Sequence, residues 1–469
     1  PREMPLAELI HVPPDSLYFA AYGALFIGME SAELSADPAS RRQDRIFPGI
    51  QRLSHYIDEG RVTQMLTSGA VSDGLVGSDE EAQQFARSHA VPPFHPPDLS
   101  PGTDLSCHLG IDGGSTSSKL VLMDPKDRLI YRDYRLSRGN PIEDLRHMFG
   151  ELHRWRQERG LRLTIQTAAI TGYAAPILKE TFHLDLEVVE TVAHMRSAVS
   201  LYGDVDVICD VGGQDIKVLF MKNRRVVDFR LNTQCSAGNG YLLQTMAEQF
   251  GVPLERYADS AFNARRAPAF NIGCAVFLEQ DRVNFQQLGW TNEEIMAGLA
   301  MVLPKNIWNH VVQEPHIARF GRRFVLQGGT QKNLAAVKAQ VDHIQAKVPG
   351  AEVHVHQHAD VCGAMGAAIE ARQMSRGEPS SFIGISRAAA VTFQATSNEQ
   401  TRCGFCDHRC PRTFVDIQAT PEREVRFISG NGCERGQAKN LEQMRHDRSA
   451  RKLLLEKNSN LVQQAATRV

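Results

Sequence analysis

Two glycine-rich turns between apolar strands constrain the fold of this chain more than any other feature of its sequence. The first is Leu109-Gly-Ile-Asp112-Gly-Gly-Ser-Thr-Ser-Ser-Lys119, where an apolar strand reaches an aspartate, small residues and then a second strand. The second, residues 205–220, repeats the order of strand, Asp210, glycine pair, polar residue and strand. Because glycine adopts positive φ without strain, each turn can fold back tightly and present backbone N–H groups to an anion.

The side chains of the first turn suit a phosphate chain with its metal ion. Ser115, Thr116 and Lys119 offer hydroxyl and ammonium donors, and an aspartate such as Asp112 can hold Mg2+ or its waters. The sequence Gly-x4-Gly-Lys-Ser/Thr is absent, so this turn is a hairpin between strands and not a P-loop. One such turn alone would also fit an ordinary structural turn, and the second copy argues against that interpretation.

A third glycine pair, Gly328 and Gly329, follows the apolar run at residues 324–327. Two hairpins that face each other across a cleft, with a glycine turn for the adenosine, resemble the ATPases of the actin, hexokinase and chaperone type. The resemblance implies an α/β fold, an actin/hexokinase-like (ribonuclease H-like) ATPase domain of two duplicated subdomains. Alternating strand and helix patterns between residues 105 and 375 favour the same fold class.

Each polar residue of the three turns has an expected role in binding ATP and Mg2+. Asp112 and Asp210 are candidate Mg2+ ligands through water, and Gln214 is the candidate to orient the attacking water. The residues expected to hold the phosphates are Gly113, Gly114, Ser115, Thr116, Lys119, Gly212 and Gly213. Those expected to border the adenosine are Gly328, Gly329 and Asn333.

The composition is that of an ordinary globular protein. Of 469 residues, 42% are hydrophobic and 23% are charged, and the formal net charge of -2 argues against bulk attraction to nucleic acid or membrane. No run of about 18 apolar residues that could span a bilayer is present in the sequence. No signal peptide is visible at the start, Pro1-Arg-Glu-Met-Pro5. Nine cysteines, four of them clustered, look more like metal chemistry than a secreted disulfide scaffold, and we expect a cytoplasmic protein.

The segment before the central domain contains a pattern that returns much later in the chain. Gly23-Ala-Leu and Gly363-Ala-Met each lead a helix of small residues that ends in glutamate and another small residue. We therefore expect residues 1–75 to be the tail of a first ATPase-like domain. Two helices that became closely packed independently are the alternative.

The remaining boundaries follow from composition. Five prolines between residues 91 and 101 predict a semi-extended linker over residues 76–104, before the ATPase domain at residues 105–375. Residues 376–400 are expected to be a connection, and residues 401–469 a cysteine-rich metal-binding module with a polar tail.

Two separate cysteines precede predicted helices. Cys235 lies in Asn232-Thr-Gln-Cys235-Ser-Ala-Gly238, and Cys274 lies in Asn271-Ile-Gly-Cys274-Ala-Val-Phe. A helix N-terminus stabilises a thiolate or an anionic iron–sulfur cluster through its free N–H groups and its dipole. On spacing alone, two buried cysteines that act as small hydrophobic residues are favoured.

The order of the motifs is more specific than any one of them. The segments Asp112-Gly-Gly-Ser-Thr-Ser-Ser-Lys, Asp210-Val-Gly-Gly-Gln-Asp, Cys235-Ser-Ala-Gly-Asn-Gly, Cys274-Ala-Val-Phe and Gly363-Ala-Met-Gly-Ala-Ala occur in one order. That order resembles the activator ATPases of 2-hydroxyacyl-CoA dehydratases and benzoyl-CoA reductases. Residues 1–75 and 400–436 resemble parts of the long multidomain CoA-substrate-specific enzyme activases.

The resemblance implies an ATP-driven one-electron donor to a partner acyl-CoA dehydratase or reductase. Cys235 and Cys274 would be ligands of a [4Fe-4S] cluster, two from each half of a homodimer or of an intrachain pseudo-dimer. Four thiolates around a two-fold axis agree with what such a cluster requires. Glu190 and His194 look like the family's segment near the cleft, although a satisfied pair on a helix face is equally compatible.

A second cysteine site is expected near the C-terminus. The pattern C-x2-C-x3-C followed by a fourth cysteine indicates a metal site with the ligands Cys403, Cys406, Cys410 and Cys433. The spacing leaves zinc and an accessory iron–sulfur cluster both open. The other cysteines, Cys107, Cys209 and Cys362, are expected to be inert core residues.

Two other functions fit parts of the same pattern. A sugar or carboxylate kinase of the same superfamily would need an acceptor pocket with a base and would stay active without iron. A non-catalytic scaffold would bind ATP without turnover. Iron and acid-labile sulfide analysis separates these functions from the activase.

Overall fold

The structure is a computed structural model of the chain. It describes residues 13–34, 49–60, 71–232, 236–314, 316–375, 377–420, 423–430, 433–440, 442–446 and 449. The chain divides into two compact units, Pro1–Gly69 and Ala70–Val469. The described helices of the first unit are η1 (Ser16–Tyr18), α2 (Phe19–Leu34), α3 (Ile50–His55) and the π-helix η2 (Tyr56–Gly60). Gly23 lies within α2, in agreement with the predicted helix.

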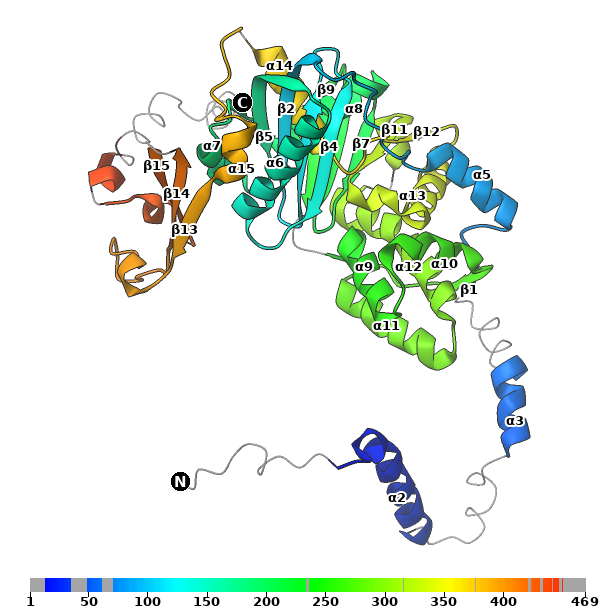
Figure 1. Cartoon of the computed structure of the whole chain (residues 1–469). Helices are drawn as coiled ribbons and strands as arrows, with labels where there is room; N and C mark the ends of the chain where they lie inside the picture. Colours follow the sequence, from blue (N-terminus) through cyan, green and yellow to red (C-terminus); the bar gives the residue numbers. More distant parts are fainter. Residues whose placement is uncertain are drawn as a thin grey trace, which may run out of the picture. The chain divides into compact units, whose positions relative to one another are not determined.

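Two five-stranded sheets of the same topology form the centre of the second unit (Figure 1). The first has the order β4 (Leu129–Leu136), β3 (Ser117–Met123), β2 (Asp104–Gly113), β5 (Arg162–Thr171) and β6 (Leu186–Glu187). The second has the order β9 (Arg225–Asn232), β8 (Ile216–Lys222), β7 (Val207–Val211), β11 (Arg323–Gln327) and β12 (Glu352–Val355). In both, three antiparallel strands continue into two parallel ones, which confirms the predicted duplicated α/β domain.

Two helices form the layer between the sheets. Helix α14 (Cys362–Met374) packs on β2, β3 and β5, and α8 (Glu190–Tyr202) packs on β7, β8 and β9. The two helices also pack against each other through small residues, including Ala193 and Ala367. Loops that precede α8 and α14 therefore open toward the space between the sheets.

Other helices cover the outer faces. Leu109 and Ile111 of β2 share a core with α6 (Pro141–Glu158) and α7 (Ala175–Phe182), whereas Gly110 faces α14, because successive residues of a strand alternate. Beside the second sheet, Trp308 packs edge-on against Phe324 of β11. The helices that follow β9 in the chain, several of which pack on α12 and not on the sheet, are η3 (Ser236–Gly238), α9 (Gly240–Gln249), η4 (Leu254–Arg256), α10 (Tyr257–Asn263), α11 (Ala275–Leu288), α12 (Asn292–Asn306), the π-helix η5 (Ile307–Val312), η6 (Ile317–Phe320), η7 (Gly329–Lys332) and α13 (Leu334–Lys347).

The segment predicted as a semi-extended linker contains a helix, so that prediction is wrong for residues 79–89. Helix α5 (Asp79–His89) begins at the N-cap Ser78, whose side chain accepts a hydrogen bond from the Glu81 N–H, with acidic residues in the first turn. Its Phe85 is buried, and Glu81 forms a 3.3 Å ion pair with Lys338 of α13. Before it, β1 (Val71–Asp73) pairs with β10 (Arg266–Pro268).

The C-terminal region also has more structure than a connection. Helix α15 (Ile385–Ala390) packs on α6, and Ile385 and Ile417 belong to the same core cluster as the first sheet. A three-stranded antiparallel sheet follows, with η8 (Glu399–Thr401) and η9 (Glu434–Gln437) beside its strands β13 (Thr392–Thr396), β14 (Thr413–Thr420) and β15 (Arg423–Ser429). Among the described residues, no helix is long and apolar enough to cross a membrane.

One buried histidine makes this fold sensitive to acid. His356 is fully buried, its Nδ1 accepts the His358 N–H at 3.0 Å, and its Nε2 lies 2.9 Å from the Ser197 hydroxyl of α8. Burial lowers the pKa of His356 to about 3. An unfolded histidine takes up a proton below about pH 6.5, so the stability present at pH 7 is lost as the pH falls toward 3.

We therefore expect this single group to remove about 2 kcal/mol of unfolding free energy between pH 7 and pH 5. Denaturant unfolding of the wild type and of His356→Gln at both pH values measures the difference. The variant should lose about 2 kcal/mol less than the wild type on acidification. His354→Gln, at an exposed histidine on β12, is the control and should follow the wild type. Equal acid sensitivity of both variants would contradict the assignment.

Candidate functional site

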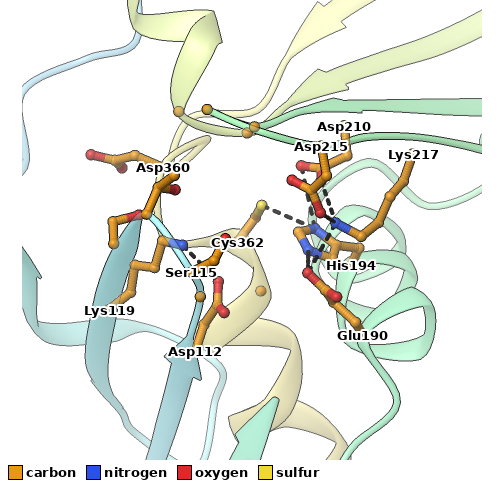
Figure 2. Close-up of a pocket in the computed structure, with 18 of the residues that line it drawn as sticks. Asp112, Ser115, Lys119, Glu190, His194, Asp210, Asp215, Lys217, Asp360 and Cys362 are labelled. Carbon is orange, nitrogen blue, oxygen red and sulfur yellow. Dashed lines mark hydrogen bonds and ion pairs between the residues drawn. The ribbon is translucent and has the colours of Figure 1, made fainter. Parts of the chain in front are cut away.

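The two predicted hairpins meet across a pocket between the sheets (Figure 2). In the first, Asp112 and Lys119 are direct cross-strand partners, and their charged groups lie 3.1 Å apart. In the second, Asp210 and Lys217 are cross-strand partners, with 3.7 Å between the Asp210 Oδ2 and the Lys217 Nζ. The duplication of the fold therefore extends to an aspartate–lysine pair in each hairpin.

Most of the predicted nucleotide-binding residues line this pocket. Those that do are Asp112, Gly114, Ser115, Thr116, Lys119, Asp210, Gly212, Gly213, Gly328 and Gly329. The turn at Gly328 requires glycine, because its φ is 94° and a Cβ there would lie 2.3 Å from the Val211 carbonyl oxygen. The three turns that are distant in sequence thus form one pocket.

Three predicted residues have other observed contacts. The Ser115 hydroxyl donates to the Gln214 Oε1 at 2.9 Å, which joins the tips of the two hairpins. Asn333 is the N-cap of α13, where its Oδ1 accepts the Ala335 N–H. Gly113 ends β2, and its carbonyl accepts the Ala174 N–H. The catalytic role of Gln214 and the nucleotide contacts of Asn333 and Gly113 stay predictions.

A buried ionic network surrounds Asp210. The Lys217 Nζ lies 2.9 Å from the Glu190 Oε1 and also pairs with Asp215. Burial by itself would lower the pKa of Lys217, but the carboxylates of Asp210, Glu190 and Asp215 outweigh it and raise that pKa. Lys217 therefore stays charged.

Glu190 and His194 of α8 complete the network. The His194 Nδ1 lies 3.4 Å from the Asp210 Oδ1, and the His194 Nε2 lies 3.8 Å from the Glu190 Oε1. Burial opposes the charged ring, but Asp210 and its other neighbours raise the pKa of His194 well above its ordinary value. The pair is part of the pocket and not only a satisfied pair on a helix face.

Sequence reasoning missed several residues of this pocket, among them Lys217, Cys362 and Asp360. Lys217 carried a signal, because it follows Asp210 by the same seven positions that separate Lys119 from Asp112. Cys362 was expected to be an inert core residue; it is buried, but its sulfur faces His194 in the pocket. Asp360 lies in the loop before α14 and pairs with Arg132, a contact that no local pattern indicates.

The donor set of the pocket fits a hard cation with its waters. Asp112 and Asp210 are both buried, and within the described part of the chain the Oδ1 of each accepts no hydrogen bond. A buried carboxylate oxygen is costly unless a cation or donor reaches it, and of these two only the Asp210 Oδ1 has such a neighbour among the described residues, the His194 ring at 3.4 Å. Oxygen ligands from two opposed hairpins are of the kind that Mg2+ prefers.

Cys274 is not among the residues that line the nucleotide pocket; it lies in the second subdomain, the part of the domain built around the sheet of β7 to β9, β11 and β12. It is exposed at the N-cap of α11, in the wall of a hollow of about 450 Å3 that Leu231 and His310 also line. Exposed apolar side chains lie next to it: Leu231 lines the same hollow, and Ile272, Val276 and Phe277 are its neighbours in the chain. Cys235 lies outside the described residues.

The cysteines of the C-terminal module lie on two segments that one arginine joins. Buried Arg412 donates to the carbonyls of Thr401, Gly436 and Ala438, so the loop with Cys403, Cys406 and Cys410 is tied to the turn that starts at Cys433. The Cys403 N–H donates to the Cys410 carbonyl at 2.9 Å. Among the described residues, no three of these sulfurs lie within 4.8 Å of one another, and this metal site stays a prediction.

The chain is similar to known proteins over more than half of its length. Residues 109–371, more than half of the chain, match the model of the BadF/BadG/BcrA/BcrD ATPase family. The 2-hydroxyisocaproyl-CoA dehydratase activator of Clostridioides difficile is 27% identical over 270 residues, which cover 56% of this chain and 94% of that protein. The (R)-2-hydroxyglutaryl-CoA dehydratase activating ATPase of Acidaminococcus fermentans is 26% identical over 266 residues, which cover 56% and 96%.

One solved structure can also be aligned with this chain. The crystal structure of the Acidaminococcus fermentans (R)-2-hydroxyglutaryl-CoA dehydratase component A aligns with a TM-score of 0.49 and 23% sequence identity. The alignment covers 57% of this chain and 98% of that one.

Proposed function

Because the chain belongs to the BadF/BadG/BcrA/BcrD ATPase family, we propose that it is a cytoplasmic ATP-dependent activase. It hydrolyses ATP to drive low-potential one-electron transfer from a [4Fe-4S] cluster to a partner acyl-CoA dehydratase or reductase. The names of two relatives, both activators of CoA dehydratases, support this class of partner. The observation that carries the proposal is a hydrogen-bonded route from the second hairpin to both cysteine segments.

That route begins at the phosphate-binding turn. The N–H groups of Gly240 and Tyr241, at the start of α9, donate to the carbonyls of Gly212 and Gly213 at 3.0 and 2.9 Å. The Asn239 side chain donates to the Gln214 carbonyl at 2.7 Å. A change of the second hairpin on ATP hydrolysis would therefore move α9, the helix that follows Cys235.

Asn306 joins the two cysteine segments. Its side chain is buried, donates to the Ala237 carbonyl at 2.8 Å and accepts the Gly273 N–H at 3.0 Å. Ala237 follows Cys235 closely and Gly273 precedes Cys274, so one side chain holds both segments in a fixed relation. For a one-electron couple, ~1.4 kcal/mol corresponds to ~59 mV, so a rearrangement worth a few kcal/mol is large enough to alter electron donation.

In the pocket, Lys119, the glycine turns and the hydroxyls of Ser115 and Thr116 would hold the phosphates. Asp112 and Asp210 would hold Mg2+ through its waters, and the bound ion would neutralise charge that develops on the phosphates. Lys217 and His194 keep the Asp210 carboxylate in place from its two sides.

Cys235 and Cys274 would hold the cluster, which when bound supplies the one-electron donor. Cys274 fits this role because it is an exposed thiol at a helix N-terminus within an apolar surface. An apolar patch of this kind is typical of a protein–protein contact. We propose that it meets a second copy, or a similar domain of a longer chain, which supplies the other two thiolates.

We further propose that Cys403, Cys406, Cys410 and Cys433 bind a second metal, zinc or an iron–sulfur cluster. The support is the spacing of the cysteines together with the Arg412 contacts that hold the two cysteine segments together. The module packs on the first subdomain, away from Cys274 in the fold, so its metal content should not depend on Cys274.

Replacing Cys274 by serine is expected to remove the [4Fe-4S] cluster and leave ATP binding intact, because serine is a poor cluster ligand. The measurement is iron, zinc and acid-labile sulfide per chain after anaerobic purification, with binding of a fluorescent ADP analogue in parallel. Cys410→Ser is the matched variant: it should lose only the metal of the C-terminal module. A full cluster in Cys274→Ser would refute the ligand assignment.

The same preparations separate the activase from its rivals. A kinase would phosphorylate an acceptor and would keep its rate in Cys274→Ser. A scaffold would bind the ADP analogue and show no ATP hydrolysis. An activase should oxidise its reduced cluster with a viologen acceptor faster in the presence of MgATP than without it.

A further inference from the structure

Three potential metal ligands converge at one side of the nucleotide pocket (Figure 2). The His194 Nδ1 lies 3.4 Å from the Asp210 Oδ1 and 3.5 Å from the Cys362 Sγ. The side chains of His194 and Asp210 are 6% and 4% exposed, and Cys362 is 2% exposed. Within the described residues, no other trio of histidine, cysteine or carboxylate ligands comes as close together.

We propose that His194, Asp210 and Cys362 form a binding site for a divalent transition metal ion of the Zn2+ class. A tetrahedral Zn2+ ion with bonds of about 2.0–2.1 Å to nitrogen and about 2.3 Å to sulfur separates those two atoms by about 3.5 Å. With an oxygen ligand at about 2.0–2.2 Å, nitrogen and oxygen are separated by about 3.3–3.5 Å. The observed distances from the His194 Nδ1, 3.4 Å to the Asp210 Oδ1 and 3.5 Å to the Cys362 Sγ, agree with both values.

The chemistry of the donors selects the kind of ion. A thiol and an imidazole are ligands that Zn2+ and similar metals prefer, whereas Mg2+ prefers oxygen. The Asp210 Oδ1 accepts no hydrogen bond among the described residues, while its Oδ2 faces Lys217. The Asp210 Oδ1 does not face Lys217 and is therefore available to bind an ion.

The surroundings favour a cation in this place. The carboxylates of Asp210, Glu190 and Asp215 outnumber the single ammonium of Lys217 that pairs with all three. The Glu190 carboxylate also lies beside the other ring nitrogen of His194, the Nε2, at 3.8 Å.

Metal binding releases to water the proton of the His194 Nδ1 and the proton of the Cys362 thiol, and it replaces two present contacts. The Gln327 Nε2 lies 2.9 Å from the His194 Nδ1, and the Cys362 thiol donates to the Ala359 carbonyl at 3.2 Å. The Gln327 Oε1 has no partner among the described residues, so the amide can turn without breaking another bond of that oxygen. The fourth position of the ion would be open to the pocket and to water.

The number of bound Zn2+ ions tests the site directly. The full chain, reduced and free of metal, is titrated with Zn2+ against a chromophoric chelator that reports the equivalents bound. Cys362→Ser is expected to bind one equivalent fewer than the wild type. Cys209→Ser is the matched control, because Cys209 is a buried neighbour of Asp210 whose sulfur faces Gln340 instead; it should bind as many equivalents as the wild type.

A second variant guards against a folding defect. His194→Gln should also bind one equivalent of Zn2+ fewer than the wild type. The double variant His194→Gln/Cys362→Ser should lose one equivalent and no more, because both substitutions remove ligands of the same site. With Co2+ in place of Zn2+, the thiolate charge-transfer absorption should be weaker in Cys362→Ser than in Cys209→Ser. Equal equivalents and equal spectra in these two variants would overturn the proposal, as would the loss of two equivalents in the double variant.

An ion at this site would withdraw Asp210 from the nucleotide, so Zn2+ should inhibit ATP hydrolysis. This consequence rests on the proposed function, unlike the metal counts. The half-inhibitory Zn2+ concentration is expected to rise at least about tenfold in Cys362→Ser, relative to its own uninhibited rate. Confirmed counts without inhibition would leave the metal site standing and contradict the role of Asp210 in hydrolysis.

Discussion

Asp210→Asn is expected to lower the rate of ATP hydrolysis by about 100- to 1000-fold, which corresponds to about 3 to 4 kcal/mol of transition-state stabilisation. Asp210 is buried at the end of β7, and its Oδ1 is available to a cation in the pocket. Asparagine keeps the shape of the side chain but removes the charge that would hold Mg2+ next to the phosphates. Lys217 keeps Glu190 and Asp215 as partners, so the fold should be retained.

The measurement is phosphate release under saturating MgATP, with binding of a fluorescent ADP analogue in the same preparations. We expect the dissociation constant of the analogue without Mg2+ to change less than about tenfold. Asp228→Asn, at an exposed aspartate of β9 in the same sheet, is the matched control and should hydrolyse ATP at the wild-type rate. Turnover of Asp210→Asn within threefold of the wild type would exclude a direct role.

Gly366→Ala is expected to destabilise the second unit by about 3 kcal/mol, a change of about a hundredfold in the unfolding equilibrium. A Cβ at Gly366 would lie 1.7 Å from the Ala193 carbonyl oxygen and 2.4 Å from its carbon. Both atoms are backbone atoms of α8, so only a displacement of one helix from the other relieves the overlap. These helices carry Glu190, His194 and Cys362, so nucleotide affinity should fall as well.

Denaturant unfolding of the full chain measures the change. Gly150→Ala is the matched control, because Gly150 lies inside α6 and a Cβ there would meet nothing within 4 Å. At that position alanine should increase stability by about 1 kcal/mol through its higher helix propensity. If Gly366→Ala unfolded like Gly150→Ala, close contact between α8 and α14 would not be what holds the two subdomains together.

The sequence predicted the local parts of the site well, because a hairpin is encoded in a short stretch. The aspartate, the glycine pair and the flanking apolar strands lie within about a dozen residues, so the register that pairs Asp112 with Lys119 follows from the turn itself. The duplication of the sheets followed from the repetition of that pattern at Asp210. The helix at α5 was missed because the prolines after residue 91 outweighed a capped turn that begins at Ser78.

The ionic network is a different case. Glu190, Lys217 and Cys362 come from three elements that are far apart in the chain, and each fits an unremarkable local pattern. Their meeting depends on α8 and α14 packing between two sheets, which close approach at small residues permits. The local periodicity of the sequence does not predict contacts of this kind, since they form only when surfaces from separate elements are buried together.

The sequence by itself therefore determined the two hairpins, the duplicated α/β fold and the family, because strand pairing across a tight turn depends on neighbouring residues. Only the tertiary structure decided that Lys217, His194 and Cys362 belong to the nucleotide pocket and that Asn306 joins the two cysteine segments. These partners are determined by burial, because a charged or polar group that is removed from water is costly unless it is paired, and the pairing group can come from a distant part of the chain.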